Sequence, residues 1–259
     1  MKTKRNVLIT GVLGGIGQAS LEKFIQVNDY VIGWSLSAED SPKATKLLDQ
    51  FKENFEYHSV DCTDEAAVSQ AMQQIVDKHK TIDVVFNIVG GSGRRYGDGP
   101  VAECTEEGYQ KTMDLNVKTQ FLVSKYAVQH MLNQGKGCII NMSSVLGLTG
   151  GNTMFGTHAY AAAKGAIISF SRAMATYYAK SNIRVNVIAP GLIETPMSQR
   201  AQNDEAILEY MNDKQPIYAG RHKLGDPKAV AVAAVFLADE DSDFTTGVVL
   251  PIDGGWTSQ

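Results

Sequence analysis

A glycine-rich loop placed directly after the first apolar run limits the possible folds more than any other feature. The run Asn6–Thr10 has the composition of a buried strand, and residues 11–17 (Gly-Val-Leu-Gly-Gly-Ile-Gly) follow it and open an amphipathic stretch. A strand, a glycine turn and a helix in this order are typical of a dinucleotide site, where backbone amides at a helix N-terminus face a pyrophosphate. A glycine turn without a ligand is the alternative, and the position in the chain favours the nucleotide site.

Short apolar runs alternate with longer amphipathic stretches along all 259 residues. This alternation predicts an α/β fold with a doubly wound, parallel, seven-stranded sheet in a single domain. Predicted strands are Asn6–Thr10, Tyr30–Trp34, Phe55–Val60, Asp83–Phe86, Cys138–Met142, Arg184–Ile188 and Val248–Ile252, and predicted helices are Ile16–Gln26, Ala44–Lys52, Glu65–His79, Glu107–Asn133, Tyr160–Ala179 and Pro227–Leu237.

The segment from about 192 to 224 interrupts this alternation. It is polar, helical in places and without a predicted strand. A long connection near the carboxyl edge of a sheet is usually a binding loop, so we interpret this segment as a substrate lid.

Charge, cysteines and hydropathy exclude several classes of partner. The net charge is −4 and no basic block occurs, so we expect no nucleic-acid partner. Cys62, Cys104 and Cys138 are scattered without metal-like spacing, which indicates reduced thiols, a cytoplasmic location and no metal site. The basic start at residues 1–5 imitates a secretory signal, but its apolar run is too short and meets glycines, so we expect no membrane partner.

Tyr160 and Lys164 are four residues apart in the run Tyr-Ala-Ala-Ala-Lys. On a helix this spacing places both side chains on one face. A phenol ordinarily has a pKa of about 10, and a fixed ammonium one turn away is expected to lower it. The pair therefore indicates a proton donor and acceptor suited to alcohol–ketone chemistry.

Together, Thr-Gly-x-x-x-Gly-x-Gly at residue 10 and Tyr-x-x-x-Lys at residue 160 resemble the short-chain dehydrogenase/reductase family over essentially the whole chain. The resemblance implies hydride transfer between a nicotinamide cofactor and a small alcohol or ketone. It implies a homotetramer or homodimer. The implied catalytic residues are Asn116, Ser144, Tyr160 and Lys164, and the implied cofactor-binding residues are Gly11, Leu13, Gly14, Gly15, Ile16, Gly17, Ser35, Asp61, Cys62, Asn87, Gly90, Tyr160, Lys164, Pro190, Gly191, Ile193 and Thr195.

Two departures from the family pattern concern the site. Residues 87–90 (Asn-Ile-Val-Gly) match the family's Asn-Asn-Ala-Gly only at the outer positions. The separation of Ser144 and Tyr160 is about three residues longer than the family commonly shows. We place the extra residues within 150–156, where they would reshape one wall of the substrate pocket. Ser143 is the neighbouring alternative to Ser144.

Cofactor preference depends on the end of the second predicted strand. An acid there bonds the ribose hydroxyls of NAD and repels a 2′-phosphate, and this chain has Ser35 instead. The basic marks of NADP preference are also missing, since Gly14 occupies a position where a basic residue often lies. The absent acid favours NADP(H) over NAD(H).

Other candidates remain open. Arg94 and Arg95 follow the fourth predicted strand and are able to hold a carboxylate or phosphate, and a solvated loop or a subunit contact is an equal alternative. His158 is interpreted as pocket wall or surface. A catalytically silent dinucleotide-binding sensor and a sugar-nucleotide epimerase or dehydratase are the competing functions. A sensor would typically lack the tyrosine or lysine, and the longer enzymes need a larger C-terminal domain.

Overall fold

Seven parallel strands form the centre of the computed structural model, which describes residues 4–221 and 223–259. Their order is β3-β2-β1-β4-β5-β6-β7, which confirms the predicted doubly wound sheet. Residues 1–3 of the signal-like start and His222 of the predicted lid lie outside the described residues. The strands are β1 (Asn6–Thr10), β2 (Tyr30–Ser35), β3 (Phe55–Ser59), β4 (Val84–Asn87), β5 (Gly137–Met142), β6 (Ile183–Pro190) and β7 (Val249–Ile252).

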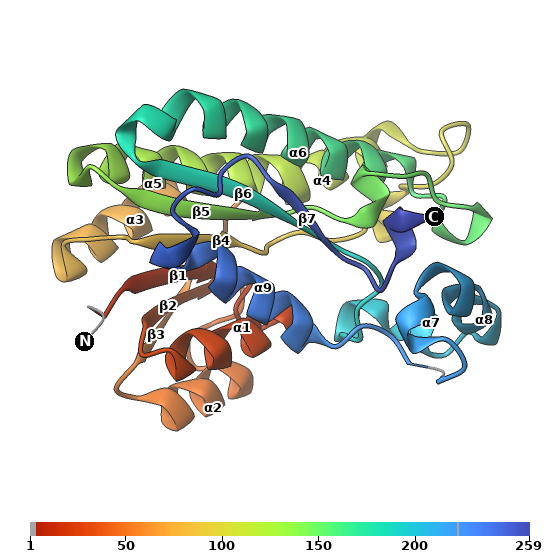
Figure 1. Ribbon diagram of the computed structural model, residues 1–259, viewed down its shortest axis with the longest axis horizontal. Helices are drawn as coiled ribbons and strands as arrows, with labels where there is room; N and C mark the ends of the chain where they lie inside the picture. Colours follow the sequence, from red (N-terminus) through yellow and green to blue (C-terminus); the bar gives the residue numbers. More distant parts are fainter. Residues whose placement is uncertain (1–3, 222) are drawn as a thin grey trace.

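Helices cover both faces of this sheet (Figure 1). The alternation of side chains along β1 shows why: Val7 and Ile9 pack into one core with Phe24, while Leu8 packs into the other with Leu122. One layer consists of α1 (Gly15–Gln26), α2 (Pro42–Phe51) and α9 (Pro227–Ala238), and the other of α3 (Glu65–His79), α4 (Glu106–Met113), α5 (Thr119–Gln134) and α6 (His158–Tyr178).

Local capping fixes where several helices begin. The Asp226 carboxylate accepts a hydrogen bond of 2.8 Å from the Lys228 amide, and Pro227 occupies the first helical position of α9. An N-cap carboxylate followed by proline is a favourable start for a helix, which the sequence predicts at Pro227. Asp64 caps α3 in the same way, accepting from the amide of Ala66.

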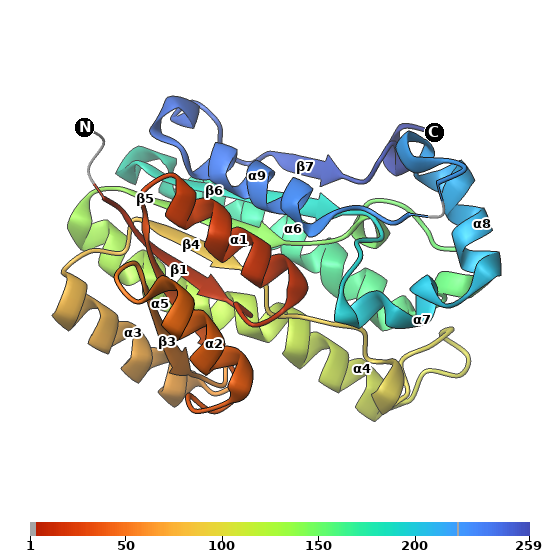
Figure 2. The ribbon, with the colours of Figure 1, turned by 90° about the horizontal axis from the view of Figure 1, so that it is seen from below.

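The strand order reverses between β1 and β4, because β2 and β3 extend the sheet on one side and β5, β6 and β7 on the other. Ligands of doubly wound sheets bind at the carboxyl edge beside such a reversal. Beyond this edge lie the short helices α7 (Gln199–Gln202) and α8 (Glu205–Lys214), clear of both layers (Figure 2). They form a small core of their own with Leu224 and Trp256.

The segment from 192 to 224 is also attached at its base. Ile193 and Gly225 form an isolated parallel bridge, a pairing that the sequence did not indicate. The buried amide of Gln215 accepts from the Leu192 amide at 2.6 Å and donates to the Leu192 carbonyl at 3.2 Å. In the part of the chain that the structure describes, no helix has both the length and the apolar character needed to cross a membrane.

Candidate active site

The glycine loop forms a tight turn between β1 and α1. Gly11 has a φ of +71°, and its amide donates to the Trp34 carbonyl at 2.7 Å. A Cβ on Gly17 would lie 2.2 Å from the Gly11 carbonyl oxygen, so a larger residue would force the turn apart. Gly14 begins α1 without a capping side chain, and the first turn contains no acid. The backbone amides in the first turn of α1 are therefore suited to an anionic ligand, and the loop fits a dinucleotide pyrophosphate.

The turn after β6 lies against this loop. A Cβ added to Gly15 would be 2.9 Å from Cγ2 of Thr195, so the two predicted cofactor segments meet. Pro190 ends β6, and a Cβ on Gly191 would lie 2.7 Å from the Gln215 side-chain oxygen. Ile193 is buried, and its carbonyl accepts from the Ser198 hydroxyl.

Ser35 and Asp61, two of the predicted cofactor-binding residues, have their polar groups engaged within the protein. The Ser35 hydroxyl accepts from the Leu13 amide at 3.3 Å, which joins the end of β2 to the glycine loop. One oxygen of Asp61 accepts from both the amide and the hydroxyl of Thr63, at 2.8 and 2.7 Å. Burial raises the pKa of Cys62 to about 12, so this thiol stays protonated and unreactive.

Residues after β4 connect the cofactor loop to the catalytic residues. The Thr10 hydroxyl accepts from the amides of Ile88 and Val89, at 3.0 and 3.3 Å. Asn87 is fully buried, and its side-chain oxygen has no hydrogen-bond partner among residues 4–221 and 223–259. A Cβ on Gly90 would lie 2.6 Å from Asn116 Oδ1 and 3.1 Å from Lys164 Nζ. Glycine at position 90 therefore leaves room for two of the predicted catalytic side chains.

Asn116 corrects the prediction of one continuous helix over 107–133. A π-helical turn, Asp114–Lys118, separates α4 from α5. The Asn116 amide nitrogen donates to the carbonyls of Gly91 and Thr112, at 2.9 and 2.8 Å, and its oxygen accepts from the Gly91 amide at 3.0 Å. The widened turn aims this buried side chain at the loop after β4, and such turns are frequent at functional sites.

Ser144, Tyr160 and Lys164 come together where β5 ends and α6 begins. The Ser144 hydroxyl accepts from the Leu146 amide at 3.2 Å and lies close enough to the Tyr160 phenol to lower its pKa. Lys164 Nζ lies 5.4 Å from the Tyr160 ring centroid and donates to the Met142 carbonyl at 3.0 Å. The Ser143 hydroxyl instead donates to the backbone carbonyl of Lys164 at 2.8 Å, so it points into the helix packing. Of the two serines, Ser144 is therefore the one that acts on the phenol.

Burial dominates the electrostatics of the Tyr160–Lys164 pair. It raises the pKa of Tyr160 to about 12, against a smaller lowering by the hydrogen bond with Ser144. It also lowers the pKa of Lys164 to about 7. The phenol pKa is therefore raised, not lowered as the spacing predicts, because in the protein alone burial outweighs the neighbouring groups that favour the phenolate.

Asp98 is a site residue that the sequence did not single out. Its two carboxylate oxygens accept from the amides of Ala159 and Tyr160, each at 3.1 Å. The contact fixes the start of α6 and with it the position of the phenol. His158 is structural, since its Nδ1 accepts from the Val101 amide at 3.0 Å. In the sequence Asp98 is only an acid within a Gly-Asp-Gly-Pro loop. Nothing local connects it to α6, which starts 60 residues later.

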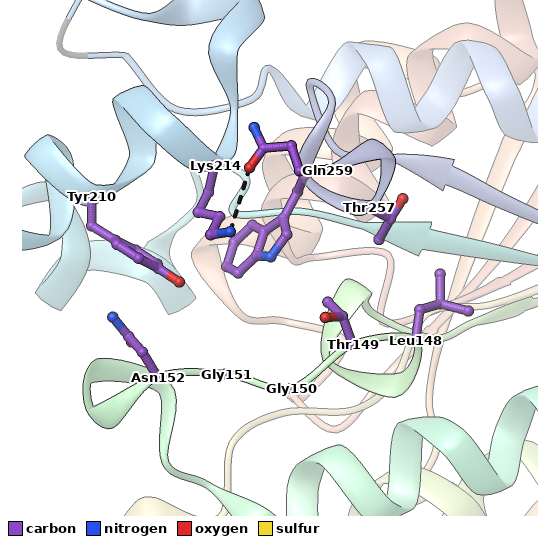
Figure 3. A pocket seen from close by; sticks show the side chains of 10 residues that line it. Leu148, Thr149, Gly150, Gly151, Asn152, Tyr210, Lys214, Thr257 and Gln259 are labelled. Atoms are coloured by element: carbon purple, nitrogen blue, oxygen red, sulfur yellow. Dashed lines mark hydrogen bonds between the residues drawn. The ribbon is translucent and has the colours of Figure 1, made fainter.

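A cavity of about 490 Å³ opens beside the extra residues before α6 (Figure 3). Asn152 lies on one side, and Tyr210 and Lys214 of α8 lie opposite. Trp256 contributes an aromatic wall and packs edge-on against Phe155, with ring centroids 5.6 Å apart. The residues that line the cavity are Leu148, Thr149, Gly150, Gly151, Asn152, Tyr210, Lys214, Trp256, Thr257 and Gln259.

The fold and the buried Ser-Tyr-Lys group together define a dinucleotide-binding oxidoreductase of the Rossmann type. A family model described as enoyl-(acyl carrier protein) reductase matches residues 11–257. The chain belongs to the short-chain dehydrogenase/reductase family.

Individual relatives agree with this assignment. The 3-oxoacyl-[acyl-carrier-protein] reductase FabG of Thermotoga maritima is 34% identical over 248 residues, which are 96% of each chain. The solved structure of ElxO with NADP bound is 32% identical, has a TM-score of 0.89, and covers 99% of this chain and 100% of its own. A gluconate 5-dehydrogenase from Burkholderia cenocepacia, solved with NADP and tartrate, is 27% identical with a TM-score of 0.89, over 98% of this chain and 96% of its own.

Proposed function

We propose that this protein interconverts a secondary alcohol and a ketone by NAD(P)-dependent hydride transfer, with Tyr160 as the general acid and base. The observation that carries the proposal is the convergence of three side chains: Ser144 acts on the pKa of the Tyr160 phenol, and Lys164 Nζ lies 5.4 Å from the Tyr160 ring centroid. When bound, the nicotinamide supplies or accepts the hydride. The Tyr160 phenol gives its proton to the carbonyl oxygen in reduction and takes it back in oxidation.

The neighbouring residues complete this mechanism. Ser144 donates to the substrate oxygen and stabilises the negative charge that develops there. Lys164 is held by the Met142 carbonyl, where it is placed to bond the nicotinamide ribose and to stabilise the phenolate. Asn116 holds the loop at Gly91 and lies beside the lysine across Gly90, which suits a role in proton relay.

The proposed cofactor site runs along the carboxyl edge of the sheet, where the loops after β1, β4 and β6 meet. NADP(H) is favoured, because Ser35 presents no carboxylate that would repel a 2′-phosphate. Two related structures, ElxO and the gluconate 5-dehydrogenase, hold NADP. The proposed residues are Gly11, Leu13, Gly14, Gly15, Ile16, Gly17, Ser35, Asp61, Cys62, Asn87, Gly90, Tyr160, Lys164, Pro190, Gly191, Ile193 and Thr195.

We further propose that residues 192–224 act as the substrate lid and that the protein works in the cytoplasm as a homo-oligomer. The lid is supported by α7 and α8, which lie beyond the sheet edge on a separate small core. An oligomer is supported by Val232 and Phe236 of α9, which are 54% and 55% exposed.

Nicotinamide absorbance, followed with a panel of ketones and alcohols, tests the function. We expect turnover with at least one secondary alcohol–ketone pair, and a higher kcat/KM with NADP(H) than with NAD(H). Binding of the cofactor without any turnover would instead support the silent sensor. A preference for NAD(H) of about tenfold, or 1.4 kcal/mol, would reverse the cofactor assignment.

A further inference from the structure

We propose that Arg94 and Arg200 together bind an anionic group of the substrate, such as a carboxylate, sulfonate or phosphate, at the mouth of the active site. This inference rests on the proposed oxidoreductase function and names its substrate class. Arg94 begins the 3₁₀ turn Arg94–Tyr96 after β4, and Arg200 lies in α7 of the lid. Two loops that are far apart in sequence therefore supply one guanidinium group each.

Both guanidinium groups donate to the same oxygen. Arg94 Nη2 lies 3.0 Å from the Met154 carbonyl oxygen, and Arg200 Nη2 lies 3.2 Å from it. Like charges that share one neutral acceptor repel each other, and Arg200 accordingly lowers the pKa of Arg94, after the larger lowering by burial. Arginine forks match the paired oxygens of carboxylate, sulfonate and phosphate groups, which would relieve this repulsion.

The nearby carboxylates only partly balance these charges. Asp204 lies 4.0 Å from Arg200, and both side chains are solvent-exposed. Asp98 raises the pKa of Arg94, but its two oxygens already accept the amides of Ala159 and Tyr160. An excess of positive charge therefore remains, in a chain whose net charge is −4.

The arginine pair lies near the start of α6, the helix that carries Tyr160. Asp98 touches the backbone of Tyr160, and a Cβ on Gly93, next to Arg94, would lie 3.1 Å from the Asp98 Cβ. Met154 belongs to the extra residues between Ser144 and Tyr160. The loop that departs from the family pattern thus holds the two arginines beside the start of α6. Arg95 takes no part, since its guanidinium lies over the Tyr96 ring at 4.6 Å.

Calorimetric titration with malonate tests the anion site without requiring turnover. We expect saturable binding to the wild type, and a loss of about tenfold to hundredfold in affinity for Arg94→Gln and for Arg200→Gln. Arg95→Gln is the matched control and should bind as the wild type does, as should Tyr160→Phe, whose chemistry is removed. No saturable binding to the wild type, or an equal loss in Arg95→Gln, would overturn the proposal.

Turnover then tests the substrate class. Within the ketone panel, we expect the wild type to reduce oxo acids with a higher kcat/KM than their ethyl esters, and the Arg94→Gln, Arg200→Gln double variant to remove the difference through KM. Equal efficiency for acids and esters in the wild type would overturn the substrate class, while leaving the proposed reaction standing. An equal loss for both in the double variant would show that the arginines only hold the loop.

Discussion

The two halves of the carboxyl edge are built in different ways. Around β1 the site consists of backbone: Gly11 has a positive φ, Gly17 leaves no room for a side chain, and α1 begins without a capping group. Beyond β4 the candidate site consists of side chains from distant segments, such as Asn116 on a π turn and, by our proposal, Arg200 on α7. The half around β1 is shaped to accept a dinucleotide, a ligand common to many enzymes. The second depends on loops that differ from one enzyme to another, and this is where substrate choice resides.

The largest expected effect lies at the boundary of the two halves. Tyr160→Phe removes the proton donor while leaving the glycine loop intact. We expect turnover to fall by roughly 10²- to 10⁴-fold with cofactor affinity close to that of the wild type, as measured by steady-state kinetics and cofactor titration. Retention of half the wild-type turnover would contradict the assignment.

Ser143 and Ser144 test the half of the carboxyl edge that lies beyond β4. We expect Ser144→Ala to lower turnover by about 10²-fold, because an oxygen-stabilising donor is lost. Ser143 is 2% exposed and bonds the Lys164 carbonyl, so Ser143→Ala should instead cost about 1 kcal/mol of unfolding free energy, with a small effect on turnover. Kinetics and chemical denaturation of both variants check this. The opposite ranking would mean that Ser143 faces the substrate.

The glycine loop provides the corresponding test of the half around β1. A Cβ on Gly17 would meet backbone at 2.2 Å, so we expect Gly17→Ala to lose about 1–3 kcal/mol of stability and to bind dinucleotide weakly. Gly14→Ala is the matched control, because its Cβ would lie 3.3 Å from the Gly11 carbonyl oxygen. Thermal unfolding and cofactor titration compare the two. Equal effects would show that the close packing at Gly17 is unimportant.

The last prediction concerns the buried lysine and the pH dependence of stability. Its pKa is about 7 in the folded protein against 10.5 in the unfolded chain, so the unfolded chain binds more protons between these values. Stability should therefore rise with pH in this window, by up to about 1.4 kcal/mol per pH unit. Lys164→Met should lose this rise, whereas Lys43→Met, at an exposed position, should keep it. Denaturation at several pH values measures the slope, and parallel slopes in all three proteins would refute the prediction.

The same difference between the halves explains what the sequence could predict. The strands, the glycine loop and the Tyr160–Lys164 spacing depend on local periodicity and short-range geometry, and the predicted sheet is confirmed. The π turn at Asn116 escaped prediction because its cause is a contact with Gly91, which is distant in sequence. The raised pKa of Tyr160 escaped for a similar reason, since burial is a property of the packed chain and not of the spacing. Asp98 and the proposed anion-binding residue Arg200 join the candidate site only where separate loops meet.

Transfer of label from reduced nicotinamide tests the central claim most directly. NADPH carrying deuterium at the transferring position of C4 is incubated with the enzyme and a ketone from the panel, and the alcohol is analysed by mass spectrometry. We predict that the wild type places deuterium on the carbinol carbon, and that Tyr160→Phe does so at about one hundredth of the rate or less. An alcohol formed without deuterium, or labelled equally fast by Tyr160→Phe, would contradict the proposed hydride transfer with Tyr160 as proton donor.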